Sequence, residues 1–207
     1  RKNSLASQVK NETAKIQAIE VQRNSNLTEI LLDFFTGDGT NMTVNNILAI
    51  DPGTTQSAWC FFDGVKVINS GIEVNEELLA KLRGWDLSGC RVAIEMIASY
   101  GMPVGKEVFE TCVWIGRFFE VVDSEAEPVL VYRKDVKLHL CQSPRAKDPN
   151  VRQALIDRFE PTGGGKIPQI GTSKQPGPLY GVSSHIWAAL AVAVTYHDTV
   201  LRPKRNN

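Results

Sequence analysis

The sequence lacks the overall features that most directly indicate a function. Its 23 lysines and arginines balance 23 aspartates and glutamates, so the chain has no net charge. Any highly charged partner, such as a nucleic acid, would therefore have to meet a local basic surface. No apolar run approaches the roughly 20 residues that a membrane helix needs, and no secretory signal is visible. We expect no membrane span.

Cysteine motifs for metal binding are absent as well. The four cysteines are far apart and form no Cys-x-x-Cys or Cys/His pair; they are Cys60, Cys90, Cys112 and Cys141. Three of them lie inside apolar runs, which favours reduced, buried thiols over a zinc site or a disulfide framework. We therefore expect a soluble, cytoplasmic protein.

The chain divides into three parts by its pattern. Residues 1–41 are mostly polar, with one short apolar run, and we interpret them as an N-terminal extension or leader of unknown role. Residues 42–200 have the length and apolar content of one domain with a substantial core. Residues 201–207 form a basic tail that we expect to fray.

The hydrophobic pattern of the middle part predicts an α/β fold. The expected strands are a hairpin over residues 46–64 and single strands over 65–74, 91–96 and 128–132. The expected helices are over residues 75–82, 105–122, 133–140, 148–159 and 183–199. Because a hairpin-led meander gives way to strands that alternate with helices, we predict a mixed sheet flanked by helices.

Local features refine this prediction. Asn75 and Asp148 are predicted N-caps of their helices. The helix over 105–122 carries an apolar stripe that we interpret as packing against the sheet, with a partner surface as the alternative. The members of this stripe are Val108, Phe109, Cys112, Val113, Gly116 and Phe119. Residues 161–184 contain no Asp or Glu and are rich in Gly, Pro and Ser, which predicts a functional or mobile loop.

Two of the predicted strands end in an acid. Asp51 ends the first strand and precedes a Pro-Gly-Thr-Thr turn, and Glu95 lies at the end of the strand over 91–96. Carboxylates are rarely buried unless they are paired or bind a metal, although Asp51 could instead cap its turn through an Asx bond. On adjacent parallel strands the two acids would meet at one edge of the sheet, where open α/β sheets form their sites.

Such a pair has a defined chemistry. Two close carboxylates repel, and one would be protonated unless a divalent cation lies between them. Hard oxygen ligands with no thiolate nearby select Mg²⁺ or Mn²⁺, and two such ions roughly 3.5–4 Å apart activate water for phosphodiester hydrolysis. His185, at the start of the final helix, is the best third ligand. A histidine that only caps the helix or bonds the backbone is the alternative.

Three segments, in this order, resemble the motifs of RuvC-type Holliday junction resolvases, particularly phage-like members, within the RNase H-like superfamily. They are Ile-Asp51-Pro-Gly-Thr-Thr, Ala-Ile-Glu95-Met and Ser-His185-Ile-Trp-Ala-Ala-Leu-Ala-Val-Ala, and the resemblance covers about residues 46–198. It implies an RNase H-like mixed five-stranded sheet flanked by helices over residues 42–200. It also implies a Mg²⁺-dependent homodimer, with Mn²⁺ as a substitute metal, that cuts four-way DNA junctions by paired symmetric nicks. Asp51, Glu95 and His185 would be its metal-binding catalytic residues, in a recombination and repair enzyme of the cytoplasm, phage-encoded in a bacterial host.

The sequence departs from that family at one position. Family members usually carry a second acid three residues after the Asp or His of the third motif, and this chain has Ala188 there. Asp198 cannot replace that acid, because it lies on a different helical face from His185. Three alternatives stay open: three ligands suffice with water and phosphate, Asp148 or another acid contributes, or the protein binds junctions without cutting them well.

Basic residues suited to a DNA backbone are concentrated in the second half of the chain. They flank the fifth predicted strand and occur in the acid-free loop: Arg133, Lys137, Arg145, Lys147, Lys166 and Lys174. Lys137 and Lys147 resemble the substrate-binding lysines of the family. Phosphate contacts would make binding dependent on salt, whereas ordinary solvated surface charge is the alternative.

Two rival functions follow from the same residues. Asp51-Pro-Gly-Thr-Thr also resembles the first phosphate loop of sugar kinases, actin and chaperone ATPases, but the chain is short for two such lobes and has no later Asp-x-Gly-Gly motif. Ala188 instead favours a junction-binding protein with weakened catalysis. We expect a homodimer, because two equivalent active sites would match the two-fold symmetry of a junction, with the helix over 105–122 as a candidate interface.

Overall fold

The computed structural model describes residues 46–122 and 128–202. The predicted extension over residues 1–41 and residues 203–207 of the predicted tail lie outside this part of the chain. None of the helices within it is long and apolar enough to cross a membrane. All four cysteines lie within it and are free; Cys60 and Cys90 are buried, whereas Cys112 and Cys141 are half-buried.

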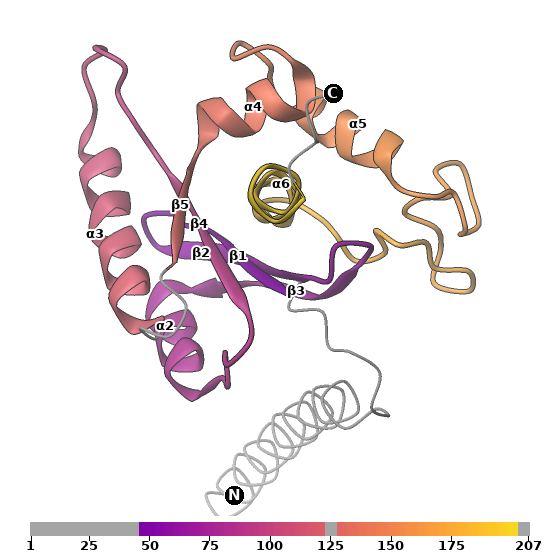
Figure 1. Cartoon of the computed structure of the whole chain (residues 1–207), viewed down its shortest axis with the longest axis horizontal. Coiled ribbons are helices and arrows are strands. Elements are labelled where there is room, and N and C mark those ends of the chain that lie inside the picture. Colours follow the sequence, from indigo (N-terminus) through magenta and orange to yellow (C-terminus); the bar gives the residue numbers. More distant parts are fainter. Residues whose placement is uncertain (1–45, 123–127, 203–207) are drawn as a thin grey trace, which may run out of the picture. The chain divides into compact units, whose positions relative to one another are not determined.

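A mixed five-stranded sheet forms the centre of the domain, with strand order β3-β2-β1-β4-β5 (Figure 1). The strands are β1 (Ile47–Asp51), β2 (Gln56–Phe62), β3 (Val67–Val74), β4 (Arg91–Met96) and β5 (Val129–Tyr132). β1, β2 and β3 form antiparallel pairs, whereas β1, β4 and β5 run parallel. The predicted hairpin and the predicted mixed sheet are therefore confirmed.

Helices cover both faces of this sheet (Figure 1). They are α2 (Asn75–Gly84), α3 (Lys106–Val121), α4 (Arg133–Cys141), α5 (Asp148–Arg158) and α6 (Ile186–Tyr196). Side chains of a strand alternate between the two faces. Leu48 and Ile50 therefore pack with α2 and α3, whereas Ile47 and Ala49 pack with α6. α4 and α5 pack against α6, so the helices that follow β5 share one side of the sheet.

α6 is the central helix of that side. Every residue of α6 except Ala188 is buried, as expected for a helix that is enclosed by the sheet and by other helices. The sequence predicted a helix over 183–199. The α-helix is shorter, Ile186–Tyr196, and continues as a π-helical turn, η1 (His197–Leu201).

The predicted packing of the α3 stripe against the sheet holds for only part of it: Phe119 packs against the core, and Val108 and Cys112 are half-buried. Phe109 and Val113 are each 62% exposed, whereas Thr111, Ile115 and Phe118 are buried against the sheet. The prediction was wrong for Phe109 and Val113 because α3 is apolar on two sides, and a pattern of hydrophobic residues alone does not say which side meets the sheet. The alternative, a partner surface, is the interpretation that fits an exposed stripe.

The loop over residues 161–184 is folded on itself through its backbone. The Gly163 N–H donates to the Pro168 carbonyl, and the Gly177 N–H donates to the Ile170 carbonyl. Gly171 has φ = +78°, and a Cβ there would lie 2.2 Å from the Gly177 nitrogen. Glycine is therefore required where these backbone segments cross.

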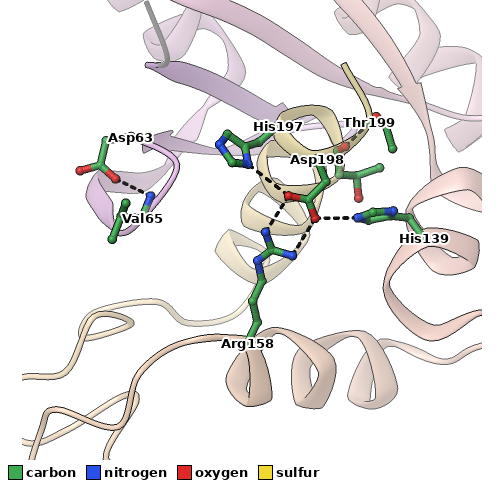
Figure 2. A network of polar contacts seen from close by, with 8 residues as sticks. Asp63, Val65, His139, Arg158, His197, Asp198 and Thr199 are labelled. Atoms are coloured by element: carbon green, nitrogen blue, oxygen red, sulfur yellow. Dashed lines mark hydrogen bonds and ion pairs between the residues drawn. The ribbon is translucent and has the colours of Figure 1, made fainter. Parts of the chain in front are cut away.

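A polar network ties the C-terminal end of α6 to α4 and α5 (Figure 2). Asp198 accepts two hydrogen bonds of 2.6 Å from Arg158 and pairs with His139 Nε2 at 2.8 Å and His197 Nδ1 at 3.1 Å. Burial alone would raise the pKa of Asp198, but the hydrogen bonds from Arg158, His139 and His197 outweigh it and lower the pKa below its ordinary value. Asp198 thus holds helices together, far from His185.

Candidate active site

Two buried carboxylates meet at the carboxyl ends of adjacent strands. β1 and β4 are parallel, with Ile50 paired to Ile94, so the next residues, Asp51 and Glu95, lie side by side. Their side chains are only 12% and 6% exposed. The structure therefore brings together the two acids that the sequence singled out.

The environment of Asp51 disfavours its charge. Burial raises the pKa of Asp51 well above its ordinary value, and the hydrogen bond with Glu95 and the repulsion between the two carboxylates raise it further. Arg133 acts in the opposite direction but does not compensate. A buried acid pair of this kind is more typical of a functional site than of a stabilising interaction.

A buried asparagine fixes the turn that follows Asp51. The Gly53 N–H donates to Ser57 Oγ (3.2 Å), Ser57 Oγ donates to Asn75 Oδ1 (2.6 Å), and Asn75 Nδ2 donates to the Gly53 carbonyl (2.9 Å). The prediction of Asn75 as an N-cap was wrong, because α2 begins at Asn75 and Val74 is its cap. The side chain of Asn75 instead holds the Pro-Gly turn against the sheet.

The two acids line a cleft with a volume of about 640 Å³. His185 Nδ1 lies 3.6 Å from Asp51 Oδ2, and the histidine side chain is 67% exposed. Ser184, immediately before it, has φ = +46°, which is uncommon for a residue other than glycine. Ala188 lines the cleft one helical turn later, so this position contributes no carboxylate.

Arg133 brings a positive charge into the cleft. Its Nη1 donates to Glu95 Oε1 at 2.9 Å, and its Nη2 donates to Asp148 Oδ1 at 2.5 Å. The prediction of Asp148 as an N-cap was wrong: Asp148 is the first residue of α5, and Lys147 is its cap. The Lys147 N–H is satisfied by Asn150 Oδ1 at 2.9 Å, which leaves the Asp148 carboxylate available for Arg133.

The donor set fits a hard divalent cation between Asp51 and Glu95. Such an ion would relieve the repulsion of the two carboxylates, and no thiol is among the described residues that line the cleft. Within residues 46–122 and 128–202, no group of three or more His, Cys, Asp or Glu side chains is arranged to hold a metal ion. The assignment of His185 as a third ligand stays a prediction.

The predicted DNA-binding residues fall into two groups. Lys137 and Arg133 line the cleft, whereas the other four are exposed outside its lining: Arg145, Lys147, Lys166 and Lys174. Sequence reasoning missed Arg152, which also lines the cleft and has its guanidinium 5.0 Å from the centre of the Trp187 ring. Its position one helical turn after Asp148 could have indicated it, since residues four apart share a helix face.

The mixed five-stranded sheet and its flanking helices form an RNase H-like α/β fold similar to that of solved RuvC structures. The structure of T. thermophilus RuvC in complex with a Holliday junction substrate matches with a TM-score of 0.50 and 18% identity, over 76% of this chain and 94% of that chain. A second Thermus thermophilus RuvC structure has a TM-score of 0.48 and 16% identity, over 73% and 92% of the two chains. No protein-family model and no curated protein matches the sequence.

Asp51→Asn should stabilise the fold by about 1 kcal/mol at neutral pH, because an amide ends the carboxylate repulsion and can donate to Glu95. The pKa of Asp51 is higher in the folded chain than the ordinary value of 3.8, which applies to the unfolded chain. The wild-type chain therefore loses stability as the pH rises from 3.8 toward the pKa of the folded state. Urea denaturation without divalent ions, at about pH 4 and about pH 8, measures the effect.

The gain in the free energy of unfolding of Asp51→Asn over the wild type should be present at about pH 8 and small at about pH 4. Asp135→Asn, which changes an exposed acid of α4, serves as the control and should show no such gain. A variant no more stable than the wild type at either pH would contradict the assigned environment of Asp51.

Proposed function

We propose that the chain is a metal-dependent, structure-selective endonuclease that resolves four-way DNA junctions by paired symmetric nicks. The observation that carries this proposal is the buried contact of Asp51 with Glu95 at the carboxyl ends of parallel strands, within a RuvC-like fold. Two carboxylates in contact can both be ionised when a cation lies between them, and oxygen ligands select hard divalent ions. A protein of the same fold, T. thermophilus RuvC, has been solved with a Holliday junction substrate.

In this proposal Asp51, Glu95 and His185 hold Mg²⁺, for which Mn²⁺ substitutes. The bound metal would supply charge stabilisation at the phosphate and lower the pKa of the attacking water. The β1–β4 register holds the two carboxylates together, and the Asn75 hydrogen bonds hold the turn beside them. His185 is exposed enough to adjust its side chain toward a ligand while its backbone stays fixed at the start of α6.

Basic side chains on α4 and α5 would bind the DNA backbone. Lys137 and Arg152 line the cleft beside the acids. Lys147 and Arg145 lie between these helices, and Lys166 and Lys174 extend the basic surface along the acid-free loop. Such a local arrangement lets a chain without net charge bind a polyanion. The cytoplasmic location and phage origin that the resemblance implies stay predictions.

We further propose that the nuclease acts as a homodimer through the exposed stripe of α3. Phe109 and Val113 lie one turn apart on this helix and are each 62% exposed. Two copies related by a two-fold axis would bury both stripes against each other and direct two equivalent clefts at a symmetric junction.

Asp51→Asn should lower the rate of junction cleavage about a thousandfold or more, because a metal ligand is lost, while junction affinity stays close to that of the wild type. Labelled four-way junctions and linear duplex, incubated with the full chain and Mg²⁺, measure cleavage, and a mobility-shift assay measures binding. Asp157→Asn, which changes an exposed acid of α5, is the matched control and should cut at the wild-type rate.

Each rival function predicts a different result in this assay. ATP hydrolysis without DNA cleavage would support the phosphotransferase, and tight junction binding without product at any metal concentration would support a junction-binding protein. Cleavage by Asp51→Asn at the parent rate would show that the site is misassigned.

Lys137→Ala should weaken junction binding and reduce the slope of log affinity against log salt by about one, because one phosphate contact is removed. Lys66→Ala, at the exposed turn between β2 and β3, should leave the slope unchanged. Fluorescence anisotropy at several salt concentrations gives both slopes. An unchanged slope for Lys137→Ala would count against the contact.

Phe109→Glu should convert the dimer to a monomer, because a carboxylate at the centre of an apolar interface is left without solvation. Val65→Glu provides the control, since Val65 is 73% exposed in the turn between β2 and β3. Light scattering of the purified chains measures the mass. If Phe109→Glu is still a dimer, the interface lies elsewhere than on the α3 stripe.

A further inference from the structure

The placement of Arg133 differs from that of an ordinary surface arginine. It is the first residue of α4, and its guanidinium bridges Glu95, whose side chain is 6% exposed, and Asp148, which begins α5. An arginine guanidinium stays protonated throughout the pH range of a folded protein, and here it is paired with two carboxylates. This arginine therefore carries a permanent positive charge within the acidic cleft.

The position of Arg133 at the start of α4 does not favour a positively charged residue. A cation at the N-terminus of a helix meets the positive end of the helix dipole and is destabilising there. An acid such as Asp148 at the start of α5 is favoured for the same reason. The carboxylates of the cleft are therefore the interaction that compensates Arg133.

The charges of the cleft can be counted from its side chains. The side chains that line the cleft include four acids, Asp51, Glu95, Glu107 and Asp148, and three cations, Arg133, Lys137 and Arg152, so with all seven ionised their net charge is −1. One divalent cation would bring this set to +1, whereas two would bring it to +3. Ala188 adds no further carboxylate to the cleft.

We propose that Arg133 is a built-in cation that takes the place of a second metal ion, so that the cleft binds one divalent ion per chain. This inference rests on the proposed function, because it concerns the metal of the same site. Arg133 acts through Glu95 and Asp148 and is a positioning residue: it orients the Glu95 carboxylate by hydrogen bonds of 2.9 and 3.3 Å from Nη1.

The proposal can be tested by counting bound ions. Isothermal titration of the full chain with Mn²⁺ should give one ion per wild-type chain. Arg133→Gln should bind a second ion, or bind the first about tenfold more tightly, because a unit positive charge beside the site no longer repels the metal. Arg133→Lys retains the charge and should restore the one-ion stoichiometry.

Arg117→Gln is the matched control. Arg117 forms a comparable pair with Glu76, with Nη1 at 2.9 Å from Oε1, outside the cleft. Its loss should change neither the affinity for Mn²⁺ nor the number of ions, so a general effect of removing an arginine is separated from an effect on the site. Circular dichroism confirms that each variant is folded before titration.

Each outcome bears on one of the two proposals. Two Mn²⁺ ions on the wild-type chain, or an Arg133→Gln chain with wild-type stoichiometry and affinity, would overturn the role of Arg133 while leaving a junction-cleaving enzyme intact. A wild-type chain that binds no Mn²⁺ would overturn the metal site of the proposed nuclease, and the role of Arg133 with it.

Discussion

The parallel pairing of β1 with β4 is the constraint on which the rest of the site depends. It puts two acids next to each other at the end of two buried strands, where both side chains are largely shielded from solvent. The fold thereby accepts an electrostatic cost at this edge. The surrounding groups offset this repulsion or hold the acids in place. An arginine pairs with Glu95, a histidine lies near Asp51, and a hydrogen-bonded turn fixes the position of Asp51.

Sequence pattern predicted the sheet and the acid pair because both depend on local regularities. Short apolar runs identify strands, and an acid that ends such a run is conspicuous. The hairpin, the parallel strands and the approximate bounds of the helices all follow from spacing. The sequence pattern alone therefore predicts that Asp51 and Glu95 lie close together.

The errors have a common physical origin in tertiary contacts. Asn75 and Asp148 have the residue types of helix caps, but each side chain is engaged by a segment distant in sequence, Asn75 by Gly53 and Ser57 and Asp148 by Arg133. The two-sided apolar pattern of α3 does not reveal which side meets the sheet. The contacts of Arg133 with Glu95 and Asp148 depend on how β4, α4 and α5 pack together, which no short-range pattern encodes.

The contacts of Asp198 with His139, Arg158 and His197 (Figure 2) connect the helices that form the cleft at the ends opposite to it. α4, α5 and α6 bring Arg133, Asp148 and His185 to the cleft at their starts, and His139, Arg158 and Asp198 join the same helices near their ends. From His185 to Asp198 the helical rise amounts to roughly 20 Å. A substitution at His139, Arg158 or Asp198 would change the cleft from a distance, because a small tilt of one helix displaces its opposite end. Related chains could therefore tune the width of their clefts through residues that never touch the substrate.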